Sequence, residues 1–281
     1  MRMFKKNFLL FFAGLWLAAG VPTAGALDKP FDHSLWDQCL KKFVNDQGEV
    51  NYAFLHMDPA LLNDYLKQIN NLSLKQVREN WPREERLALW LNVYHAGIFK
   101  AVEDHYPVKS IQDIPGIWDI TLIHMGKVAF SLNQIRQHFL IEEFRDEKIH
   151  MALSCGAASC PRLSREAFTG PKVEGQLFLA AQNFVNDPDY NKIVPGQDKI
   201  WLSKIYKWYA SDFKLDFGAA ENDRGLSNQE YAVLSFISHY AQDLDKIQYL
   251  QEGRYKIKYL DFDWRLNQSH SASNEKSSSP A

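Results

Sequence analysis

Residues 87–102 read LALWLNVYHAGIFKAV, and this stretch decides the fold. It is apolar on nearly every side, which predicts a helix buried at the centre of a domain. Asn92 and His95 lie three residues apart and therefore share one side of this helix. Leaving a buried amide or imidazole without a partner costs about 1 to 3 kcal/mol. We therefore expect both side chains to have partners, in either a structural or a catalytic role.

Shorter elements are predicted around this helix. The hydrophobic periodicity and the turn signals predict helices at 31–44, 58–69, 131–140, 173–186, 205–209 and 228–241, a hairpin from 120–123 and 127–130, and strands at 148–154, 199–202 and 255–260. Helices and strands mix without a regular βαβ alternation. This favours an α+β fold, a single domain with a central buried helix packed on a small mixed or antiparallel sheet.

The two ends of the chain have their own compositions. Residues 1–26 combine a basic start, a short apolar run and the small-residue site Ala24-Gly25-Ala26, which is typical of a secretory signal peptide. The apolar run is shorter than the roughly 20 residues that a membrane span needs. We therefore expect a periplasmic or secreted protein with no stable membrane span after cleavage. The domain is expected over 27–267, followed by a disordered Ser-rich tail at 268–281.

The net charge limits the possible partners. The formal charge of the whole chain is −2, and removing residues 1–26 takes away three positive charges and no acids, which leaves −5. Nucleic acids and anionic membrane surfaces need a basic face, so neither is expected as a partner. The apolar fraction of 46% supports a substantial core.

Several segments resemble motifs of one family. Trp90 to Ala96 reads WLNVYHA, 149–155 reads IHMALSC and leads to Cys160-Pro161, and 259–267 reads YLDFDWRLN. In this order they are similar to motifs of the DUF547 family, and the similarity extends over about 31–267. The family is one of undefined function, so the resemblance implies a fold and a site but no activity. His95 stands where the family usually has asparagine, which cannot act as a general base.

The segment SCGAASCP at 154–161 holds two of the three cysteines. On the predicted strand, His150 lies on the opposite face from Cys155, which belongs to the apolar set. Cys160 follows a turn of small residues and could approach His150. We expect a pocket between the Asn92 helix, the His150 strand and this loop.

The first hypothesis for this pocket is thiol-dependent hydrolysis or acyl transfer on an amide or thioester. A thiolate needs an activating neighbour. The catalytic residues would be Cys160 as nucleophile, His150 as base and Asn92 as the group that orients the imidazole or donates to an oxyanion. Five further residues are expected to bind the substrate: His95, Cys155, Ser159, Trp208 and Asp263.

Three alternatives remain open at this point. The pocket could belong to a non-catalytic binding module for a peptide, thiol or sugar, helped by the tryptophans 118, 201, 208 and 264. Zinc could be held by His150, Cys155, Cys160 and His95, although the spacing is at the loose end for such sites. A Cys155 to Cys160 disulfide would close a small loop and leave Cys39 buried on its amphipathic helix. The ligand is expected to be a small molecule or peptide, no cofactor or metal is assigned, and whether the protein is an enzyme stays open.

Overall fold

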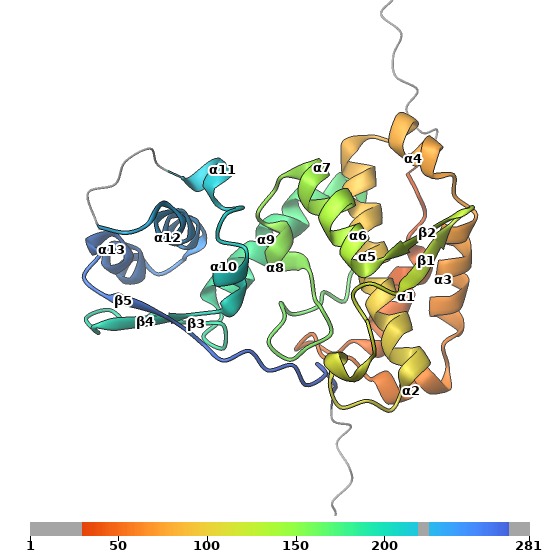
Figure 1. The fold of residues 1–281 in the computed structure, drawn as a ribbon, viewed down its shortest axis with the longest axis horizontal. Coiled ribbons are helices and arrows are strands. Elements are labelled where there is room, and N and C mark those ends of the chain that lie inside the picture. The colour runs from red at the N-terminus through yellow and green to blue at the C-terminus, as the bar shows by residue number, and fades with distance from the viewer. Residues whose placement is uncertain (1–29, 219–224, 270–281) are drawn as a thin grey trace, which may run out of the picture.

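Helix α5 (Arg83–His105) lies among the other helices of the larger end of the molecule (Figure 1). The computed structural model describes residues 30–218 and 225–269. Every residue of α5 from Leu87 to Phe99 is buried, which confirms the prediction of a central helix. The predicted signal peptide lies outside the described residues, as does the predicted tail apart from Gln268 and Ser269, of which Ser269 N donates to Val50 O at 3.0 Å.

Short elements cover α5. They are α1 (Ser34–Phe43), α2 (Tyr52–Met57), α3 (Ala60–Asn70), α4 (Leu74–Asn80), the hairpin β1 (Thr121–Met125) and β2 (Val128–Ser131), α6 (Leu132–Gln134), a π-helix η2 (Ile135–Ile141), α7 (Glu142–Phe144), and two 3₁₀ turns, η1 (Ile111–Asp113) and η3 (Gly170–Lys172). The antiparallel hairpin confirms the predicted pair of strands. The capping box between Ser131 and Gln134 also forms, but the helix that it begins continues as a π-helix.

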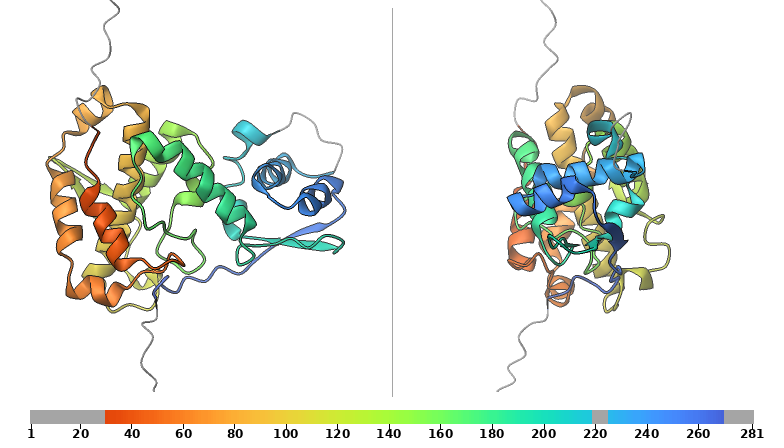
Figure 2. Two further views of the ribbon diagram at one scale, coloured as in Figure 1. Left: turned by 180° about the vertical axis from the view of Figure 1, so that it is seen from behind. Right: turned by 90° about the vertical axis from the view of Figure 1, so that its left-hand side faces the viewer.

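A second group of elements follows the cysteine loop (Figure 2). It contains β3 (Asn191–Lys192), β4 (Lys199–Leu202), α10 (Lys204–Trp208), α11 (Lys214–Phe217), α12 (Asn228–Tyr240), α13 (Leu244–Glu252) and β5 (Lys256–Tyr259). The strand order is β3-β4-β5, with β3 antiparallel and β5 parallel to β4.

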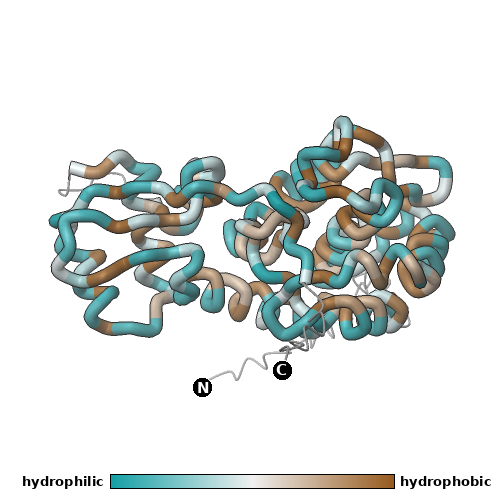
Figure 3. Tube along the Cα trace, turned by 90° about the horizontal axis from the view of Figure 1, so that it is seen from below, coloured by the Kyte–Doolittle hydropathy of each residue, from teal (hydrophilic) through white to brown (hydrophobic). Residues whose placement is uncertain are grey.

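Two hydrophobic clusters stabilise these two groups, and helix α9 (Val173–Asn186) joins them. Its first turns place Val173 and Leu177 in the cluster around α5, whereas its last turns place Ala181 and Phe184 in the cluster of the second group. Figure 3 shows that hydrophobic residues recur along the elements of both groups. After β5, the chain runs back from the second group to the first (Figure 1). The α+β class is therefore confirmed, with two small sheets instead of one.

The strand predicted at 148–154 is wrong. This segment forms the short helix α8 (Ile149–Ala152), in which all residues are buried. Asp146 starts the turn, because its carboxylate accepts from Lys148 N at 3.0 Å and its carbonyl accepts from Ile149 N at 3.2 Å. A short run of buried residues fits a helical turn as well as a strand, so periodicity could not distinguish them.

No helix within 30–218 and 225–269 is both long enough and apolar enough to cross a membrane.

Candidate functional site: two cavities beside a disulfide loop

A disulfide joins Cys155 to Cys160, with Cα atoms 5.6 Å apart. Gly156 opens the loop in a left-handed conformation, with φ +80°, and a Cβ there would lie 2.9 Å from Ile98 Cγ2 of α5. Glycine meets both requirements, because it tolerates positive φ and has no Cβ. The third cysteine, Cys39, is buried in α1, as predicted, and burial raises the pKa of its thiol to about 12.

The C-terminal segment holds this loop from the other side. Ala158 N donates to Arg265 O at 2.7 Å. Ser159 and Asp263 bond reciprocally, since Ser159 N donates to Asp263 O at 3.2 Å and Asp263 N donates to Ser159 Oγ at 2.9 Å. Ser159 and Asp263, predicted as substrate-binding residues, are thus used to attach the C-terminal segment to the loop.

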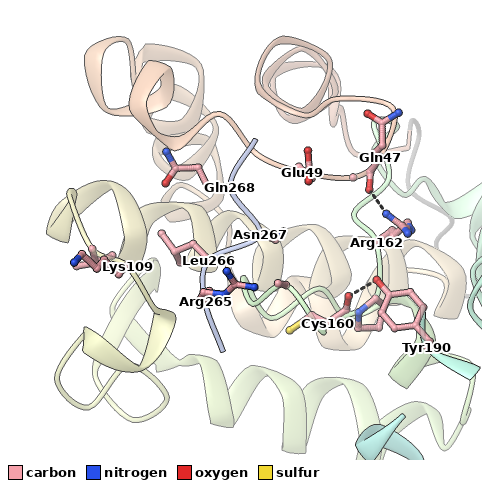
Figure 4. A pocket seen from close by; sticks show the side chains of 14 residues that line it. Gln47, Glu49, Lys109, Cys160, Arg162, Tyr190, Arg265, Leu266, Asn267 and Gln268 are labelled. Carbon is pink, nitrogen blue, oxygen red and sulfur yellow. Dashed lines mark hydrogen bonds between the residues drawn. The ribbon is translucent and has the colours of Figure 1, made fainter. Parts of the chain in front are cut away.

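Two cavities adjoin the disulfide loop. The aromatic cavity measures about 310 Å³ and is lined by Tyr94, Trp118, Asn133, Arg136, His150, Leu153, Cys155, Pro161, Ile205, Trp208, Tyr209, Phe262 and Trp264. The polar cavity measures about 480 Å³ and is lined by Gln47, Gly48, Glu49, Val108, Lys109, Ala158, Cys160, Pro161, Arg162, Tyr190, Arg265, Leu266, Asn267 and Gln268 (Figure 4). Pro161 lines both cavities. A larger hollow of about 650 Å³ beside α9 includes none of the predicted site residues.

The two cysteines face different cavities. Cys155 is partly exposed and lines the aromatic cavity, whereas Cys160 is 2% exposed and lines the polar cavity. The predicted strand grouped Cys155 with the apolar residues, but Cys155 is the more exposed of the two cysteines. The segment before it forms the helix α8, so the alternation of strand faces on which that grouping rested does not apply.

His150 is the centre of a polar cluster in the wall of the aromatic cavity. Its Nε2 lies 2.9 Å from Asp212 Oδ2, and its ring stacks on Tyr209 with centroids 4.2 Å apart and planes inclined by 10°. Arg136 Nη1 donates to the Tyr209 hydroxyl at 3.0 Å, and its Nη2 donates to Asn133 Oδ1 at 3.3 Å. Of the described residues that line this cavity, Arg136 is the only one with a permanent charge.

Burial controls the protonation of this cluster. It lowers the pKa of His150, against the opposing effect of the Asp212 carboxylate, and the hydrogen bond from His150 lowers the pKa of Asp212. At neutral pH the imidazole is therefore neutral and Asp212 is ionised. Because a carboxylate only accepts hydrogen bonds, Nε2 carries the proton and Nδ1 carries the lone pair. Nδ1 makes no hydrogen bond within residues 30–218 and 225–269.

Another part of the lining is aromatic and comes from two distant parts of the chain. Trp208 ends α10, and Phe262 and Trp264 follow β5. Trp208 stacks on Trp264 with ring centroids 5.8 Å apart, and the centroids of the Trp208 and Phe262 rings are 4.8 Å apart. Trp208 remains 45% exposed. A wall of this kind offers flat apolar faces to a ring.

The polar cavity has a different chemistry. Figure 4 shows the Tyr190 hydroxyl beside the backbone of Cys160, where it donates to Cys160 O at 2.7 Å. Three cations line the cavity, but two of them are paired. Arg162 bonds Asp187 and Asp189, each at 2.8 Å, and Arg265 bonds Asp263.

Asn92 and His95 attach the segments on either side of the disulfide loop to α5. Asn92 Nδ2 donates to Phe168 O at 2.8 Å, and Phe168 N donates to Asn92 Oδ1 at 3.0 Å. His95 Nε2 accepts from Ser154 N at 3.1 Å, and burial lowers the pKa of His95 to about 4. Both side chains have the partners that the sequence required, and all of these partners are backbone groups.

The structure does not bring the predicted catalytic residues together. Cys160 lies in the other cavity from His150 and is bonded to Cys155, and both ends of the Asn92 amide are occupied. A role for Cys160 as nucleophile stays a prediction, and it requires that the disulfide first be reduced. The described part of the chain contains no group of three or more potential metal ligands.

Sequence reasoning placed Trp208 and Cys155 in the site and missed Arg136 and Asp212. Arg136 lies on the π-helix, and such helices are frequent at functional sites. Asp212 is 62 residues from His150 in the chain. The aromatic run before Asp212 was the only signal in that region. Trp201, which had been considered for the pocket, does not line the aromatic cavity and is 42% exposed on β4.

Comparison with known proteins finds one family model that matches part of the chain. Residues 78–185 match the family model described as "Protein of unknown function, DUF547". No curated protein and no solved structure matches the chain. The match includes Arg136, His150 and the disulfide loop, whereas Trp208, Asp212 and Trp264 lie beyond it. It supports the DUF547 family for the part of the chain that contains α5 and the two cysteines.

Proposed function

We propose that the protein is a binding module and that the aromatic cavity receives a small ligand with a flat ring and a carboxylate. The observation that carries this proposal is the lining of the cavity: among the described residues it has aromatic walls, one arginine and no acidic residue. Its volume of about 310 Å³ is at the lower end of the range for small-molecule sites, which are apolar with a few placed polar groups.

The ligand's orientation follows from the positions of these groups. Its ring would stack on Trp208, which is exposed enough to provide an open face. Its carboxylate would bond the Arg136 guanidinium, because hydrogen bonds between arginine and a carboxylate are charge-assisted and stronger than neutral ones. An aromatic acid, the C-terminal aromatic residue of a peptide and a uronic acid all share this chemistry.

The disulfide supports an extracytoplasmic location. Disulfides persist in oxidising compartments and are rare in the cytosol. Together with the signal-like residues 1–26, the Cys155 to Cys160 bond favours a periplasmic or secreted protein, and we include that location in the proposal.

Calorimetric titration tests the binding proposal. The panel consists of N-acetyltyrosine, its neutral amide, a dipeptide ending in phenylalanine and glucuronate. We expect at least one acid to bind with 1:1 stoichiometry, and the neutral amide to bind about tenfold or more weakly because it lacks the charge. The acid that binds best shows whether the natural ligand is an aromatic acid, a peptide C-terminus or a uronic acid.

Two tryptophan variants provide the matched control. Trp208→Ala should weaken binding of the best acid by about tenfold, since it removes the stacking face. Trp201→Ala removes a tryptophan of similar exposure from β4 and should leave the affinity unchanged. Equal affinities for the two variants, or no binding by any member of the panel, would contradict the proposal.

A further inference from the structure

We propose that the Cys155 to Cys160 disulfide exchanges with a thiol that binds in the aromatic cavity, and that the incoming sulfur is received by Cys155. The inference rests on the proposed function, because it uses the same cavity, and it specifies a ligand class: a ring-bearing acid that carries a thiol.

The two sulfurs are unequally accessible. Cys155 lines the aromatic cavity and is partly exposed, whereas Cys160 is 2% exposed behind it. Thiol–disulfide exchange depends on which sulfur can be approached and on how well the other one leaves. The geometry therefore directs an incoming thiol from the aromatic cavity to Cys155.

His150 provides the base for this step. It lines the same cavity as Cys155, its proton is held on Nε2 by Asp212, and its Nδ1 lone pair has no hydrogen bond to any described residue. A thiolate is the attacking species, so a neutral imidazole in the cavity promotes the reaction by taking the thiol proton.

The step balances as follows. The thiol gives its proton to His150 and its sulfur attacks Cys155 Sγ. A new sulfur–sulfur bond forms to Cys155, the bond from Cys155 to Cys160 breaks, and Cys160 leaves as a thiolate. The return of Cys160 to Cys155 releases the thiol again, so the cycle needs no external oxidant.

The surroundings of Cys160 suit a leaving group. Lys109, Arg162 and Arg265 line the polar cavity with it, and cations near a sulfur favour the thiolate. Arg162 forms ion pairs with Asp187 and Asp189, and Arg265 forms one with Asp263. Lys109 Nζ has no ion pair within the described ranges.

Backbone hydrogen bonds hold the loop in addition to the disulfide. Its backbone is fixed by bonds from Ala158 N to Arg265 O at 2.7 Å and from Asn267 N to Gly156 O at 3.0 Å. An opened disulfide would therefore leave both sulfurs close together, which makes the exchange reversible.

Mapping of adducts tests the proposal on the oxidised full-length protein. The probe is 4-(mercaptomethyl)benzoate, which has a ring, a carboxylate and an aliphatic thiol. After incubation, the freed thiol is alkylated with iodoacetamide and peptides are mapped by mass. We expect the probe on Cys155 and the alkyl group on Cys160. The probe on Cys160, or no adduct in the folded protein, would overturn the proposal.

Single-cysteine variants give an independent test. Cys160→Ser leaves Cys155, and Cys155→Ser leaves Cys160, while Cys39 stays buried in both. With dithiobis(2-nitrobenzoate), an aromatic acid disulfide, Cys160→Ser should react at least about tenfold faster, because its thiol opens to the cavity. Equal rates, or a faster Cys155→Ser, would contradict the accessibility on which the inference depends.

The role of His150 has its own readout. His150→Gln should slow the exchange of the probe by about tenfold or more near pH 7, where the probe thiol is protonated. The two rates should converge above the pKa of the probe thiol, where no base is needed. A constant ratio at all pH values would show that His150 has only a structural role.

Thiol-free 4-methylbenzoate separates the two proposals. If it binds by calorimetry but the thiol probe gives no adduct, exchange is excluded and the binding function remains. If neither binds nor reacts, the aromatic cavity is not a ligand site.

Discussion

The aromatic cavity and the polar cavity share Pro161 and one disulfide, but they differ in chemistry. The first has ring faces, a neutral histidine and one arginine, whereas the second has three cations, largely paired with neighbouring acids. Each cysteine lines only one of them. Two cysteines only five residues apart therefore lie in different chemical environments. Their neighbours in the sequence do not determine which groups surround each sulfur.

The largest effect is expected from the hydrogen bonds that attach the segment after the disulfide loop to α5. Asn92→Ala removes two hydrogen bonds and leaves the buried backbone groups of Phe168 without partners. We expect a loss of about 3 kcal/mol in the free energy of unfolding, measured by urea denaturation. A loss below about 1 kcal/mol would show that Phe168 is held mainly by contacts other than its hydrogen bonds to Asn92.

The next effect should distinguish the cavities. Arg136→Met removes the only permanent charge among the described residues that line the aromatic cavity and should weaken binding of the carboxylate ligand by about 10- to 100-fold. Arg162→Met removes a cation from the polar cavity and is the matched control, with no change in affinity expected. If Arg162→Met weakened binding more, the carboxylate would bind in the polar cavity. Calorimetry gives both affinities.

The disulfide should contribute more modestly to stability. It closes a loop of small size, and the chain-entropy model gives about 2 kcal/mol for such a loop. The double variant Cys155→Ser with Cys160→Ser should therefore fold, with a free energy of unfolding about 2 kcal/mol lower. Failure of this variant to fold would contradict the claim that the C-terminal segment holds the loop independently.

The smallest effect concerns pH. Burial lowers the pKa of His95 to about 4, from an unfolded value near 6.5. The unfolded state therefore binds more protons below pH 6.5, and stability falls as the pH decreases from 6.5 towards 4. Between pH 7 and pH 5 we expect a loss on the order of 1 to 2 kcal/mol from this residue.

His95→Gln tests this assignment, because the longer glutamine side chain can place its oxygen where Nε2 accepts from Ser154 N but does not titrate. Its stability should depend less on pH than that of the wild type. His33, whose pKa burial also lowers to about 4, should account for part of the remaining slope. An unchanged slope in His95→Gln would show that His95 is not the titrating group.

Local patterns predicted much of the fold. The apolar run of α5, the hairpin and the cap at Ser131 were predictable because they depend on neighbours in the chain. The segment before Cys155 was not, since a short buried helix and a strand have the same composition. The π-helix under Arg136 also has no sequence signal. The pairing of His150 with Asp212 depends on tertiary packing, so the sequence indicated the motif residues but not the cavity that they line.

A protection measurement tests the central claim most directly, that Cys155 opens into the ligand cavity and Cys160 does not. The rate at which iodoacetamide labels the remaining loop thiol is measured in Cys160→Ser and in Cys155→Ser, with and without a saturating carboxylate ligand from the panel. We predict that the ligand slows labelling of Cys155 by about tenfold or more, because it covers the sulfur, and leaves the slow labelling of Cys160 unchanged. Equal protection of both thiols, or no protection of Cys155, would contradict the account.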